Sequence, residues 1–152
     1  MHRKILASLF AASALSACAH QPIVAANAEM AWSLRPTPGE TTLRFETPRG
    51  DATLLSLSCE PHSGDVDITI HAAPARMSLV ALSSDGQRAR YIMEAGLSPS
   101  DEPILSGVTK ASDPVLKRFA ETGDLMVFAS GHGQMLPLAQ EKAAKFLASC
   151  RR

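Results

Sequence analysis

Several features that mark common protein classes are scarce or missing in this chain of 152 residues. The apolar stretch from Ile5 to Ala17 is shorter than the roughly 20 residues that a membrane-spanning helix requires. Neither sign of charge is in excess, because 15 basic side chains balance 15 acidic ones. This balance gives no clustered basic surface for nucleic acid and no polybasic segment to hold anionic lipid. We therefore expect no nucleic-acid partner.

Patterns typical of metal sites and active sites are missing as well. The stretch Ser130-Gly131-His132-Gly133 does not form a Gly-x-Ser-x-Gly nucleophile elbow, because Phe128 occupies the position of the first glycine. The same stretch lacks the third glycine of a dinucleotide-binding loop. We therefore expect no cofactor and no enzymatic activity. After residue 17 the chain has four histidines, namely His20, His62, His71 and His132. They show neither the i, i+4 helical spacing nor the short Cys/His spacing of a zinc site.

The amino-terminal segment has the build of an export signal. Arg3 and Lys4 come first, an uncharged run from Ile5 to Ala14 follows, and the small residues Ser16 and Ala17 end it. The next residue is Cys18, and Leu15-Ser16-Ala17-Cys18 resembles the lipobox of bacterial lipoproteins.

This resemblance implies an address and an anchor. It implies that the thiol of Cys18 is alkylated with diacylglycerol and that the chain is cleaved on the N-terminal side of Cys18. It also implies an outer-membrane anchor facing the periplasm, because Ala19 stands where an aspartate retains enterobacterial lipoproteins in the inner membrane. One alternative stays open: Ala14, Ser16 and Ala17 would also suit the ordinary signal peptidase, and Cys18 would then have no role.

These features divide the chain into a signal peptide at residues 1–17, a lipidated cysteine and tether at 18–28, and a single β-rich domain at 29–152. Loss of Arg3 and Lys4 lowers the 15 basic side chains to 13, against 15 acidic ones. Membrane attachment would then depend on the acyl chains of Cys18 alone. Of the three cysteines, Cys59 and Cys150 remain as a pair in an oxidising compartment, which predicts a disulfide.

The pattern of the domain predicts a mainly β, α+β fold, namely an antiparallel sandwich or open barrel with a short helix and a C-terminal helix packed on it. Alternation of apolar and polar residues predicts strands at 41–47, 53–59 and 65–70, and Asp85-Gly86 predicts a hairpin turn between two further strands. The fully apolar run Leu125–Ala129 predicts a central strand, followed by a turn at 131–133. The single tryptophan, Trp32, is expected to fill one end of the sheet rather than to form an exposed binding platform.

Two helices are predicted near the C-terminus. Asp113 and Pro114 favour a helix start, and Gly123 favours its end. A final helix is predicted to begin at Pro137 and to reach Cys150. Its apolar stripe is Ala139, Ala143, Phe146, Leu147 and Cys150.

Much of the domain is similar to a lipobox-bearing family of small alphaproteobacterial lipoproteins and secreted proteins of unknown function. The similarity lies in a tryptophan in the first strand, in Leu55–Gly64, in Pro114–Gly123 and in Phe146–Cys150. These motifs imply a fold and no catalytic residue. Periplasmic lysozyme inhibitors are a second comparison, because Ser130-Gly131 resembles the start of their Ser-Gly-x-x-Tyr loop, although no tyrosine follows here.

Together these observations predict a monomeric, lipid-anchored binding or structural module of the cell envelope, with an envelope protein as its candidate partner. The alternative is an inhibitor of a periplasmic lysozyme or protease, which would present the loop Ser130, Gly131, His132 and Gly133 to its target. An enzyme is the third reading.

Overall fold

The structure is a computed structural model, and it describes residues 29–71, 77–129 and 132–152. In this part of the chain nine strands form one antiparallel sheet in the order β1-β2-β3-β4-β7-β6-β5-β8-β9. The strands are β1 (Ala31–Pro36), β2 (Thr41–Glu46), β3 (Thr53–Cys59), β4 (Asp65–His71), β5 (Met77–Ser84), β6 (Gln87–Leu97), β7 (Pro103–Lys110), β8 (Leu125–Ala129) and β9 (His132–Leu136). The helices are α1 (Pro114–Thr122) and α2 (Gln140–Cys150).

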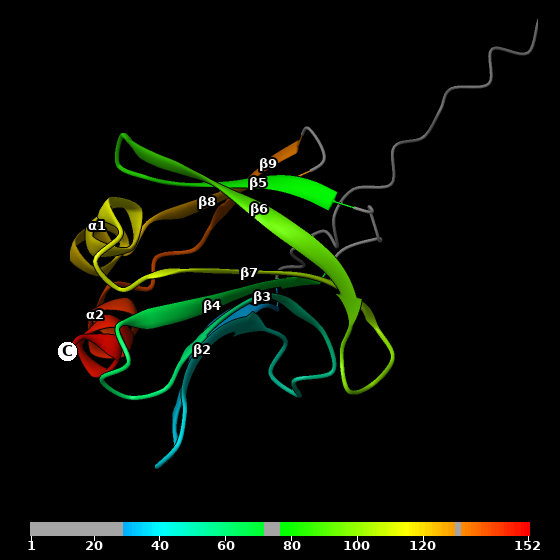
Figure 1. Ribbon diagram of the computed structural model, residues 1–152, viewed down its shortest axis with the longest axis horizontal. Helices are drawn as coiled ribbons and strands as arrows, with labels where there is room; N and C mark the ends of the chain where they lie inside the picture. Colours follow the sequence, from blue (N-terminus) through cyan, green and yellow to red (C-terminus); the bar gives the residue numbers. More distant parts are fainter. Residues whose placement is uncertain (1–28, 72–76, 130–131) are drawn as a thin grey trace, which may run out of the picture.

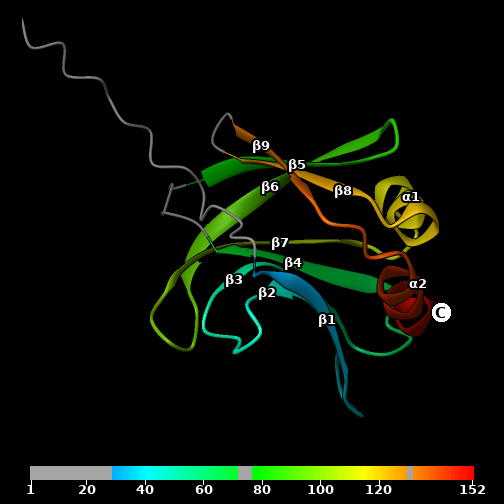
Figure 2. The ribbon, with the colours of Figure 1, turned by 180° about the vertical axis from the view of Figure 1, so that it is seen from behind.

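The sheet is curled into an open half-barrel. Strands β1 to β4 form one half and β5, β6, β8 and β9 the other, while β7 pairs with β4 on one side and with β6 on the other (Figure 1). Both helices lie at the same end of the curl, as the view from behind also shows (Figure 2). The predicted mainly β fold with a C-terminal helix is thus confirmed, as an open curl of one sheet.

The inner face of the curl is apolar because alternate strand residues point to the same side. Leu55, Leu57 and Cys59 of β3 are buried there, as predicted from their period of two. Trp32 is also buried, and its ring centroid lies 5.4 Å from those of Phe45 and Phe119. Its indole Nε1 donates a hydrogen bond to the carbonyl oxygen of Pro137 over 2.7 Å. The expectation that this tryptophan fills the sheet is confirmed.

The ends of α1 follow from local chemistry. The carboxylate of Asp113 accepts a hydrogen bond from the amide of Val115 over 2.8 Å, and Pro114 occupies the first turn, where no amide donor is needed. Gly123 ends the helix with φ of 80°. Its lack of a side chain is required, because a Cβ atom there would lie 2.3 Å from the backbone nitrogen of Gln140. This close approach lets α1 pack against α2.

Three sequence expectations are wrong in detail. Strand β8 is next to the edge of the sheet rather than central, and Phe128 is half-buried on its outer face under the guanidinium of Arg88, 4.6 Å away. Gly133 lies in β9 and not in a turn; it pairs with Phe128 of β8, and a Cβ atom there would meet the Phe128 ring at 2.6 Å. Helix α2 begins at Gln140 and not at Pro137, since the amide of Ala139 bonds to the carbonyl of Gly123 over 2.8 Å.

Candidate anion-binding cleft

Two segments that are far apart in the sequence are joined at the helical end of the sheet. The disulfide between Cys59, the last residue of β3, and Cys150, the last residue of α2, is confirmed, with Cα atoms 5.7 Å apart. The amide of Gly64 donates to the carbonyl of Cys150 over 2.9 Å, and the amide of His62 donates to that of Ser149 over 2.8 Å. We call residues 59–64 and 149–152 the C-terminal clamp.

The clamp also contacts Arg151 and Arg152. The Nε of Arg152 donates to the carbonyl of Ser63 over 2.8 Å. The Nδ1 of His62 lies 3.0 Å from the carbonyl oxygen of Arg151. The clamp thus holds Arg151 by its backbone and Arg152 by its side chain.

Gly64 connects the clamp to the start of α1. Its φ of 82° is a left-handed conformation that favours glycine, and its carbonyl accepts a hydrogen bond from the amide of Ala111 over 2.9 Å. Ala111 follows β7 directly and precedes the N-terminal residues of α1. The link between β3 and β4, the start of α1 and the end of α2 therefore meet at one place.

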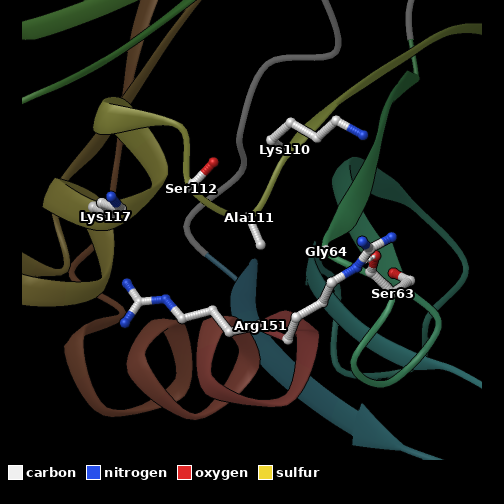
Figure 3. Close-up of a pocket in the computed structure, with 8 residues that line it drawn as sticks. Ser63, Gly64, Lys110, Ala111, Ser112, Lys117 and Arg151 are labelled. Atoms are coloured by element: carbon white, nitrogen blue, oxygen red, sulfur yellow. Dashed lines mark hydrogen bonds between the residues drawn. The ribbon is translucent and has the colours of Figure 1, made fainter.

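A cavity of about 540 Å³ lies where these three segments meet. In the close-up view, Arg151 borders the same open space as Ala111 and Ser112, although it is far from them in the sequence (Figure 3). We call it the basic cleft, and it is lined by Ser63, Gly64, Lys110, Ala111, Ser112, Lys117, Arg151 and Arg152.

The charge around the basic cleft is positive. Lys110 points away from the centre (Figure 3) and forms an ion pair with Asp65 of β4. Within the described ranges no carboxylate pairs with Lys117 or Arg151, and Arg152 bonds to a neutral carbonyl group. Three cations therefore remain without an acidic partner in this part of the chain.

The nearest N-cap carboxylate does not neutralise these cations by contact. Asp113 accepts hydrogen bonds from the hydroxyl groups of Tyr91 and Thr109, each over 3.0 Å, besides the amide of Val115. Burial raises the pKa of the Tyr91 hydroxyl, and the negative charge of Asp113 raises it further. The carboxylate of Asp113 is thus bonded to Tyr91, Thr109 and the amide of Val115 rather than to a cation of the basic cleft.

The residue types of the cleft suit binding of an anion. Arginine presents parallel N–H donors to a carboxylate or a phosphate, and lysine adds a compact charge. The exposed Ser112 adds a hydroxyl group. The described lining of the cleft contains no histidine and no carboxylate side chain, and its charged side chains are all cations.

The predicted site residues fall in different places. Cys18, Ser130 and Gly131 lie outside the described residues. His132 and Gly133 begin β9, and Gly133 does not line the basic cleft. The predicted partner loop and the cleft are thus separate candidates.

Sequence reasoning missed Lys117, Arg151 and Arg152. A signal for two of them was present, because a disulfide from Cys150 to Cys59 carries the adjacent arginines to the link after β3. The position of Lys117 depends on how α1 packs, for which the sequence offered no signal.

The described residues show neither a metal site nor a membrane-spanning helix. They contain no group of three histidine, cysteine or acidic side chains that could hold a metal ion. In the same part of the chain no helix has the length and apolar character to cross a membrane.

Fold and cleft define a curled antiparallel β-domain with a cation-lined cleft beside its two helices. The chain matches no protein-family model, and no curated protein or solved structure shows significant similarity to it. The resemblance to small alphaproteobacterial lipoproteins therefore stays a prediction.

Proposed function

We propose that this protein is a lipid-anchored module of the cell envelope that binds an anionic ligand in the basic cleft. The observation that carries the proposal is the convergence of Lys117, Arg151 and Arg152 on one cavity without an acidic partner in the described chain. Like charges held close together repel one another, and an anion between them removes that repulsion. The ligand class is a phosphate or carboxylate group carried by an envelope component.

The C-terminal clamp supports this proposal. It holds the backbone of Arg151 through the disulfide at Cys150 and a contact with His62, and it holds the side chain of Arg152 at Ser63. Side chains whose conformational freedom is already restricted lose less of it on binding.

The anchoring and the location of the protein are part of the proposal as well. The lipobox resemblance at Leu15–Cys18 supports acyl anchoring on Cys18 and an outer-membrane position facing the periplasm. A disulfide is consistent with that compartment, because disulfides persist where the environment is oxidising. The inhibitor alternative stays a prediction, since its loop includes Ser130 and Gly131, which lie outside the described residues.

A calorimetric titration tests the proposal. The probes are pyrophosphate and citrate, added to the purified full chain at low ionic strength, where exposed charges act over the longest range. The double variant Lys117→Gln/Arg151→Gln should bind at least about tenfold more weakly, which corresponds to about 1.4 kcal/mol. Arg90→Gln is the matched control, because Arg90 is an exposed cation on β6 that does not line the cleft. Equal affinities for the wild type, the double variant and the control would contradict the proposal.

A further inference from the structure

Strands β2, β3 and β4 lie side by side, and the face of the sheet that they turn away from the core is polar. Thr42 is opposite Ser58, Arg44 is opposite Ser56, and Ser56 is in turn opposite Thr69. Because neighbouring strands lie about 4.8 Å apart, the register sets these polar side chains in rows across the strands. This pattern contrasts with the apolar face on the other side of the same strands.

A cavity of about 340 Å³ lies over these rows, and we call it the outer-face groove. The link between β6 and β7 borders it, and Glu102 in that link lies with its Oε2 atom 3.6 Å from Nδ1 of His71 at the end of β4. The lining residues that carry the argument are Thr42, Arg44, Ser56, Ser58, Thr69 and His71.

Arg44 is the first sign that a ligand belongs here. Its Nε atom is buried and has no hydrogen-bond partner in the structure, and no described carboxylate forms an ion pair with its guanidinium. Buried donors are nearly always bonded, so an unbonded one indicates a missing partner. Among the described residues the guanidinium is a donor without an acceptor.

The hydroxyl groups of the groove are the second observation. Thr42, Ser56 and Thr69 line it, and no side-chain hydrogen bond among the described residues engages their hydroxyl groups. Their oxygen atoms are not among the buried unbonded atoms, so they are open to the groove. Each of these groups can both donate and accept a hydrogen bond. Such a row suits a ligand that itself carries many hydroxyl groups.

The charge of the groove separates it from the basic cleft. Arg44, Glu40 and Glu102 belong to the same lining, which thus holds one cation and two carboxylates besides His71. Burial lowers the pKa of His71, although Glu102 opposes this effect, and a neutral imidazole offers one donor and one acceptor. The groove therefore has no excess positive charge to attract an anion.

We infer that the outer-face groove binds a neutral glycan chain through hydrogen bonds from Arg44, His71 and the rows of hydroxyl groups. Sugar hydroxyls both donate and accept, which matches the lining, and a chain lying across the strands meets a new polar row at each strand. The described lining contains no phenylalanine, tyrosine or tryptophan ring for stacking, so binding depends mainly on hydrogen bonds and is weak. This site is independent of the proposed anion site.

The test uses tetra-N-acetylchitotetraose, a neutral soluble glycan, titrated into the isotope-labelled full chain and followed by amide chemical shifts. Shifts should appear on β2, β3 and β4 and not at the basic cleft. Arg44→Met should weaken binding at least about fivefold. The double variant Ser56→Ala/Thr69→Val should do the same with unchanged thermal stability, because both hydroxyls lack internal partners.

Ser106→Ala is the matched control. Ser106 is opposite Thr69 in the register, yet it does not line the groove, so its loss should leave the affinity unchanged. If Arg44→Met fails to fold, the double hydroxyl variant decides the matter alone. Absence of shifts on these strands, shifts elsewhere only, or equal affinity of the double variant and the wild type would each overturn the inference. Pyrophosphate, which probes the basic cleft, should cause no shift in the groove.

Discussion

The backbone amide of Gly64 donates a hydrogen bond to the carbonyl oxygen of Cys150 over 2.9 Å. This bond runs beside the disulfide that joins Cys59 to Cys150 across a sequence separation of 91 residues. The last turn of α2 is thereby fixed to the link between two core strands. As a result, the side chains of Arg151 and Arg152 begin at a defined place beside the basic cleft.

The first prediction concerns this disulfide. Replacing Cys59 or Cys150 by serine should lower the free energy of unfolding by about 2–5 kcal/mol, as loss of a native disulfide does in small secreted domains. Both single variants should be affected alike, because each removes the same bond. Urea unfolding of both variants and the wild type measures the effect. Hydrogen exchange should show faster opening at residues 146–152 than in the sheet.

The same variants test the connection between the disulfide and the cleft. Affinity for pyrophosphate should fall in both, since Arg151 and Arg152 are then held at the link after β3 by hydrogen bonds alone. Intact-mass analysis of the unreduced, alkylated protein provides the control. Alkylation of both Cys59 and Cys150 in the wild type would show that the bond does not form.

The second prediction concerns Gly123. Gly123→Ala should destabilise the protein by at least about 1–2 kcal/mol, because φ of 80° is unfavourable for a residue with a Cβ atom. The clash with the backbone of Gln140 adds to this cost and separates α1 from α2. Gly39→Ala is the matched control, since a Cβ atom there meets nothing within 4 Å. Equal thermal stability of the two variants would contradict the close contact of the helices.

The third prediction concerns Tyr91, the single tyrosine of the chain. Its pKa is raised by burial and by the charge of Asp113, so in the folded state it should ionise well above the ordinary value of about 10. Above pH 10 the unfolded chain loses this proton while the folded chain keeps it, and stability should therefore fall as the pH rises. Ultraviolet absorbance of the phenolate reports on this residue alone.

A companion variant separates this effect from other titrations. Tyr91→Phe should cost about 1 kcal/mol at pH 8, because the hydrogen bond to Asp113 is lost. The difference from the wild type should shrink above pH 10. A phenolate that appears at the ordinary pH in the folded protein would show that Tyr91 is not buried beside Asp113.

The fourth prediction concerns the anchor. Cys18→Ser should abolish labelling by radioactive palmitate and should move the protein from the membrane fraction to the soluble periplasm. The physical reason is that a chain without acyl groups has no polybasic surface to hold it on lipid. A wild-type protein that takes no label would contradict the predicted lipid anchor.

Several parts of the fold could be predicted because the determining interactions are local. The turn at Asp85-Gly86 has positive φ at both residues, 37° and 82°, as a tight hairpin requires. Asp113 caps α1, and Gly123 ends it, for reasons that lie within one helical turn. The disulfide was predictable too, because Cys59 and Cys150 fall on apolar faces and remain as a pair once Cys18 is assigned to the predicted anchor.

The sequence by itself therefore indicated most of the strands, both helices and many of the faces that they bury, since these follow from periods of 2 and 3.6 residues, but it did not indicate β9. The order of the strands was decided only by the tertiary structure, which inserts β7 between β4 and β6 and places β8 beside β5. Such pairings join distant segments, and no local pattern encodes them. The convergence of Lys117 with Arg151, and the unbonded Nε of Arg44 among hydroxyl groups, arise in the same way. Both candidate sites depend on packing that brings together residues whose local sequence gives no sign of one another.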